Sequence, residues 1–195
     1  MDEAIMVLVV FGITIFHTIT MTPYWFKLME LSMVFTSLNP GTLFTILMAA
    51  FTILTILIYY LFAIPAGLLS KGGVGTAFIN FAYPLIPLAL FFHLGHNVLH
   101  LFGEGQKIVV VASDPFGWGW DIFGTARTSL EPIISLSIIP YIQWVMVLTG
   151  FGFSIYLSYR VRMGWRGFVP VAVMIIMLTV AYLWMLSQPM VMRMG

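Results

Sequence analysis

Three histidines, His93, His96 and His100, are the residues of this chain whose type and spacing best suit chemistry. They lie within residues 72–103, a segment without Asp, Glu, Lys or Arg that is long enough to cross a bilayer. Ionisable side chains at membrane depth are costly, so they usually mark functional sites. Imidazole is the least costly of them because it can stay neutral and bind a metal. The segment therefore predicts a cofactor or metal site within a membrane.

On an α-helix the three histidines share one face, within an arc of about 60°. His93 and His100 lie about 10.5 Å apart along the axis, so only neighbouring pairs can act together. His96 and His100 are spaced i, i+4, and Glu104 extends this series if the helix persists past Gly103. Imidazole and carboxylate donors suit a Cu or Zn ion. One hypothesis is therefore a metal site of His96, His100 and Glu104.

A second hypothesis places one histidine on each side of a porphyrin, as cofactor sites in helical bundles do. His17, in the first apolar segment, supplies the second helix. We expect one b-type haem, bound by His17 and one of His96 or His100, with His93 as a further candidate ligand. The alternative for all four histidines is hydrogen bonding between helices as packing contacts.

The composition identifies a membrane protein. Hydrophobic residues make up 61% of the 195 residues and charged residues only 8%, against roughly 25% charged residues in a soluble domain. We expect one membrane domain over residues 1–195. The net charge of +1 offers no basic surface for nucleic acid. The absence of cysteine excludes cysteine-bound iron–sulfur clusters and c-type haem within this chain.

Apolar windows between the charged residues predict an all-α bundle of five transmembrane helices, with a long apolar loop between the third and fourth. The turn signal Asn39-Pro40-Gly41 divides a 40-residue window into an interfacial lead-in, residues 31–38, and the second helix. Pro84 and Pro87 predict a bend in the third helix. The predicted helices are residues 4–23, 42–67, 76–102, 133–159 and 168–187.

All four histidines are expected toward one membrane side, because the first and third helices cross in the same direction. The loop of residues 104–131 starts there, and we expect it to lie on the membrane or re-enter it. Trp118 and Trp120 in this loop suit interfacial anchoring, with quinone stacking as an alternative. Lys and Arg are balanced between the sides. The cluster Arg160, Arg162 and Arg166 favours the amino terminus inside and the carboxyl terminus outside a prokaryotic cell membrane.

Residues 81–105, FAYPLIPLALFFHLGHNVLHLFGEG, are followed at residues 113–125 by SDPFGWGWDIFGT. Together they resemble the membrane-embedded part of polyferredoxin-type respiratory membrane proteins, over about a fifth of the chain. The resemblance implies membrane electron transfer near the quinone pool, with His93, His96 and His100 as the matching residues. Because the cluster cysteines are missing, any iron–sulfur centre is expected in a partner subunit.

We therefore expect a membrane subunit of a multisubunit respiratory or redox complex, more readily than an independent enzyme. A chain with so little mass outside the membrane has no evident place for a soluble substrate. Other membrane subunits and a redox partner would dock at the histidine side. The alternative is a non-redox scaffold subunit, with or without a structural or catalytic Cu or Zn ion at the histidines.

Overall fold

The computed structural model describes residues 1–128, 131–161 and 164–189. Within these ranges the regular elements are all helices, and five are long and apolar enough to span a membrane. The predicted all-α fold with five spans is therefore confirmed. The spans are α1 (Asp2–Ile19), α3 (Pro40–Leu68), the run Gly73–Glu104, α7 (Ile139–Arg160) and α8 (Gly164–Leu186).

Three span boundaries differ from the sequence prediction by about a turn or more, and α8 is one of them, since it begins at Gly164 rather than at residue 168. α1 ends at Ile19 rather than at residue 23, since the Thr20 and Thr22 hydroxyls bond backbone carbonyls and Pro23 opens the next helix. α7 begins at Ile139 rather than at residue 133. Pro140 is the reason, because proline has no amide hydrogen to donate and is accommodated best in the first turn of a helix.

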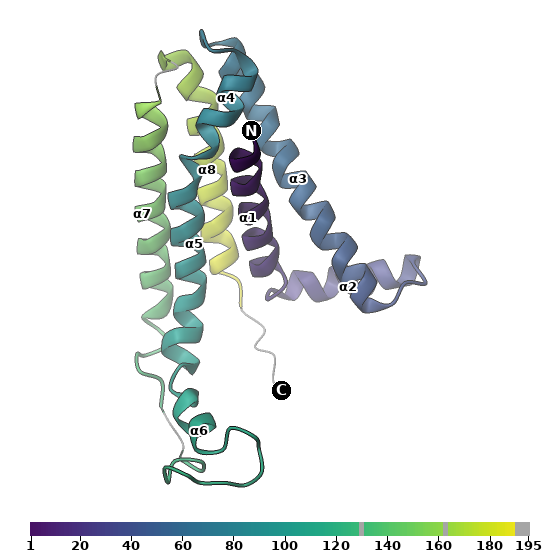
Figure 1. The fold of residues 1–195 in the computed structure, drawn as a ribbon, viewed down its shortest axis with the longest axis vertical. Coiled ribbons are helices and arrows are strands. Elements are labelled where there is room, and N and C mark those ends of the chain that lie inside the picture. The colour runs from purple at the N-terminus through teal and green to yellow at the C-terminus, as the bar shows by residue number, and fades with distance from the viewer. Residues whose placement is uncertain (129–130, 162–163, 190–195) are drawn as a thin grey trace.

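Helix α2 (Pro23–Phe35) lies across the ends of α1 and α3 in Figure 1 instead of running alongside them. It covers part of the predicted interfacial lead-in and starts earlier than residue 31. Its last residues, Val34 and Phe35, are highly exposed apolar side chains. The predicted turn before α3 is present: the Asn39 side chain accepts a hydrogen bond from the Thr42 N–H at 2.9 Å and caps the helix.

The third span is interrupted where its prolines predict a bend. α4 (Gly73–Ala82) ends before the Tyr83–Pro84 turn, and α5 (Leu85–Leu99) follows it. A π-helical turn, η1 (His100–Glu104), extends α5 past Gly103. The histidines of this span therefore lie on the part of the helix beyond the proline break.

Helix α5 is held between α7 and an aromatic core formed with α1 and α8. The ring of Tyr182 on α8 stacks on Phe92 with centres 3.7 Å apart, and it also contacts Phe11 on α1. On the side that faces α7, Gly150 packs so closely that an added Cβ would lie 2.8 Å from the Phe91 Cβ. This packing fixes the face of α5 that turns inward.

The connection between α5 and α7 projects beyond the ends of the spans, and α6 (Lys107–Ser113) lies within it (Figure 1). It does not return between the helices, so re-entry into the bundle is not observed over its described residues. The Asp114 carboxylate accepts hydrogen bonds from the N–H groups of Trp118 and Gly119, which orders the loop. Arg162, used for the predicted orientation, lies outside the described residues.

Candidate functional site: a buried histidine pair

The imidazole of His96 is completely buried on α5, and both of its ring nitrogens lack a hydrogen-bond partner among the described residues. Leaving a buried polar group unpaired costs about 1–3 kcal/mol. Native proteins seldom accept that cost without a reason such as an ion, water or ligand. His96 is therefore the residue of this site whose hydrogen-bonding groups are not satisfied by the described residues.

His17 from α1 meets His96 directly. The two ring centres lie 5.2 Å apart and the rings meet edge to face, at 86°. His17 lies in the last turn of α1 and is exposed, whereas His96 is enclosed. The structure thus brings together imidazoles from the first and third spans, at the same end of the bundle.

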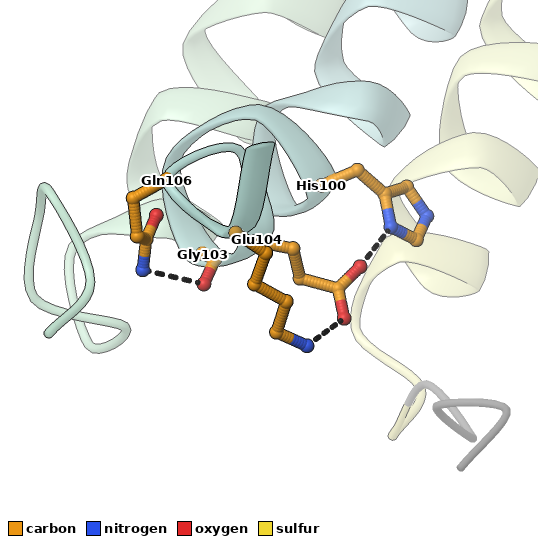
Figure 2. Close-up of polar contacts among 5 residues, drawn as sticks. His100, Gly103, Glu104 and Gln106 are labelled. Atoms are coloured by element: carbon orange, nitrogen blue, oxygen red, sulfur yellow. Dashed lines mark hydrogen bonds and ion pairs between the residues drawn. The ribbon is translucent and has the colours of Figure 1, made fainter. Parts of the chain in front are cut away.

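His100 joins this pair from the π-helical turn, with its ring centre 5.8 Å from that of His96. Its Nδ1 lies 2.9 Å from Glu104 Oε2, and Lys107 Nζ donates to Glu104 Oε1 at 3.1 Å (Figure 2). When neutral His100 donates from Nδ1 to the carboxylate, its lone pair is on Nε2. A carboxylate behind an imidazole is the arrangement that orients metal-binding histidines in proteins.

His93 does not join the other three rings, although it shares their helix. It is exposed, and the Asn97 side-chain amide donates to the His93 carbonyl at 2.8 Å and lies 3.4 Å from His93 Nε2. His93 and Thr14 line one end of an apolar groove of about 420 Å³ between α1 and α5. This groove ends one helical turn from the His17–His96 pair.

A metal ion held by protein side chains alone is poorly supported by this geometry. Zn sites use three or four protein ligands, and no three His, Asp or Glu side chains converge on one point in the part of the chain that the structure describes. Glu104, a member of the sequence-derived set with His96 and His100, is instead engaged by His100 and Lys107. It orients His100 rather than joining His96.

A haem needs only two imidazoles, one from each side, which is the number that α1 and α5 supply. A haem held by two imidazoles would lie between the two rings, which needs a wider separation than direct ring contact gives. His17 and His96 are in direct edge-to-face contact at 5.2 Å, so to hold a haem the two rings would have to move apart and each turn a ring nitrogen toward the space between them. The exposed position of His17 leaves room for that movement.

Sequence reasoning missed two buried polar side chains, Gln143 on α7 and Tyr182 on α8. Gln143 Nε2 and the Tyr182 hydroxyl are buried without a hydrogen-bond partner among the described residues. The Gln143 backbone packs against Gly95, the neighbour of His96 in the chain. The available signal was a glutamine within an otherwise apolar window, which is as unusual as a histidine there.

Comparisons with known proteins do not assign this chain to a family. No protein-family model matches the chain, and no curated protein or solved structure is significantly similar to it.

Proposed function

We propose that this chain is a membrane subunit of a multisubunit redox complex and binds one b-type haem through His17 and His96. The observation that carries the proposal is the completely buried His96 ring, whose two nitrogens have no described partner. A b-type haem in this place would take up and release one electron at a time. The imidazoles would hold it between α1 and α5.

The number of imidazoles favours haem over a Cu or Zn ion. Two helices each present one ring at the same depth, which meets the need of a haem. A protein-bound Zn ion requires more donors than converge here. The His100–Glu104 pair lies beside His96 and would supply a polar group at the edge of the site, where it could stabilise charge on a bound cofactor.

The proposed partners would dock at the end of the bundle where the histidine pair lies. The loop of residues 105–128 projects there with Phe116, Trp118 and Trp120 in mutual ring contact and exposed. Aromatic residues are enriched at protein interfaces and at the membrane surface. Other membrane subunits and a redox partner would dock at this end, near the quinone pool. The resemblance to polyferredoxin-type respiratory membrane proteins supports the same placement near the quinone pool. We place the amino terminus inside a prokaryotic cell membrane.

The direct test is the haem content of the full chain purified from membranes of cells that are supplied with haem. We expect one haem per chain and a reduced b-type absorption spectrum. His96→Ala and His17→Ala should each lose the bound haem, because a single axial imidazole holds a haem weakly in an exposed site. His93→Ala is the matched control and should keep the spectrum, because His93 lies outside the ring pair.

A wild-type chain without haem, or a b-type spectrum that persists in both ligand variants, would contradict the haem proposal. Metal analysis of the same samples tests the second candidate, a scaffold subunit with a Cu or Zn ion. The oriented His100 Nε2 favours that candidate. Equimolar Cu or Zn that is lost in His100→Ala would support it, and haem that is retained in His100→Ala would exclude it.

A further inference from the structure

A second pocket lies at the end of the bundle opposite the histidines. It forms where α3 turns into α4 and where α8 begins, and its volume is about 720 Å³. Its lining includes Lys71 and Arg166 together with three polar side chains, Ser70, Thr76 and Asn80. We call this cavity the basic pocket.

The basic pocket carries two positive charges without a negative one. Neither Lys71 nor Arg166 forms an ion pair with a carboxylate within the described ranges, and none of the described lining residues is acidic. Two cations that face one cavity repel each other, so an anion between them relieves the repulsion. Arginine and lysine are also the side chains that bind phosphate oxygens most often.

Two helix amino termini add to this positive field. α4 begins at Gly73 without a side chain capping its first turn, and α8 begins at Gly164, which also lines the pocket. The first N–H groups of a helix have no partner within the helix, and its amino-terminal end carries partial positive charge. Phosphate groups bind at such ends. The helix termini and the two cations therefore favour the same kind of ligand.

The position of the pocket at the end of the spans indicates a lipid as the source of the phosphate. Trp165 and Leu69 line the pocket and are 66% and 54% exposed, as expected for side chains at the boundary between headgroups and acyl chains. Basic pockets between transmembrane helices on the cytoplasmic side bind anionic lipid headgroups. In the orientation given above, this end of the bundle is the cytoplasmic one.

We propose that the basic pocket binds the phosphate group of an anionic phospholipid, with Lys71 and Arg166 as its paired cationic contacts. This site is separate from the histidine pair and does not depend on any cofactor there. It would fix the chain to the anionic leaflet and hold the α3–α4 turn against the start of α8.

Native mass spectrometry of the full chain, titrated with phosphatidylglycerol or phosphatidylcholine in detergent, tests the proposal. We expect the wild type to bind phosphatidylglycerol more tightly than phosphatidylcholine. Lys71→Gln and Arg166→Gln should each weaken phosphatidylglycerol binding about fivefold, and the double variant roughly 25-fold. The charge-preserving double variant, Lys71→Arg with Arg166→Lys, should bind nearly as well as the wild type.

The matched control removes one lysine and one arginine elsewhere. Lys27→Gln with Arg127→Gln makes the same change in net charge at exposed positions outside the pocket. It should leave phosphatidylglycerol binding unchanged. An equal loss in this control and in the pocket variants would overturn the proposal, because general electrostatic attraction would then explain the binding.

Excess inorganic phosphate distinguishes a lipid from a soluble anion as the ligand. If phosphate leaves the bound phosphatidylglycerol in place, the lipid assignment is supported. If phosphate displaces the lipid, and binds the wild type but not the double glutamine variant, the pocket is a soluble-anion site and the lipid assignment is wrong. Equal binding of phosphatidylglycerol and phosphatidylcholine would also overturn the proposal.

Discussion

The backbone N–H of Leu88 on α5 donates a hydrogen bond to Ser154 Oγ on α7, at 3.1 Å. Leu88 follows the proline-broken segment of the third span, where Pro84 precedes the first turn of α5. A neighbouring hydroxyl is one way in which membrane helices satisfy backbone groups near a proline break. This contact joins α5 and α7, which lie side by side (Figure 1), just before the histidine segment.

Ser154→Ala should lower the free energy of unfolding by about 0.5–2 kcal/mol, because it removes this buried acceptor. Denaturation in mixed micelles, followed by circular dichroism, measures the change. The matched control is Ser158→Ala one turn later, whose buried hydroxyl has no described partner, so its removal should cost nothing. Equal losses in the two variants would show that the Leu88 bond contributes little.

Gly150→Ala tests the close packing of α7 on α5. A Cβ at this position would lie 2.8 Å from the Phe91 Cβ and 2.9 Å from the Pro87 carbonyl oxygen, so the two helices must move apart. We expect a loss of stability of about 1–3 kcal/mol. Gly152→Ala is the control on the same helix, since nothing lies within 4 Å of its added Cβ. The same denaturation assay should show no loss for the control.

His96→Leu should leave the cofactor-free chain as stable as the wild type, or raise its free energy of unfolding by up to about 3 kcal/mol. The substitution removes two buried nitrogens that have no described partner and keeps an apolar side chain in the core. His100→Leu should instead be slightly destabilising, by under about 1 kcal/mol, through loss of its bond to Glu104. A large loss for His96→Leu would favour histidine as a packing contact over a ligand.

Acidification should loosen the loop after α6. The backbone N–H of Ala126, together with the Ser113 hydroxyl, lowers the pKa of Asp121 below its ordinary value. A carboxylate with a lowered pKa contributes stability that is complete above its ordinary pKa and is lost as the pH falls through the lowered one. Tryptophan fluorescence of Trp118 and Trp120 should change over that acidic range. Asp121→Asn should remove this fluorescence transition. If the transition persists in the Asp121→Asn variant, another titrating group causes it.

The sequence alone determined the outline of the fold. Uncharged apolar windows of sufficient length predict five spans because a bilayer of fixed thickness requires about 20 apolar residues per crossing. The Asn39-Pro40-Gly41 turn and the break near Pro84 were also predictable, since proline removes a backbone donor in any context. The common side of His17 and His96 followed from counting the crossings.

Only the tertiary structure decided which side chains meet. Hydrophobic patterning separates buried from exposed faces in water, but in a bilayer both faces of a helix are apolar. The sequence therefore placed His93, His96 and His100 on one face, whereas the packing of α5 against its neighbouring helices buried His96 and left His93 exposed. Likewise, Glu104 was within reach of His100 by spacing, but its engagement by both His100 and Lys107 depended on the π-helical turn and the start of α6. Which side chains meet depends on the distance and angle between neighbouring helices, and the packing of the whole bundle sets both.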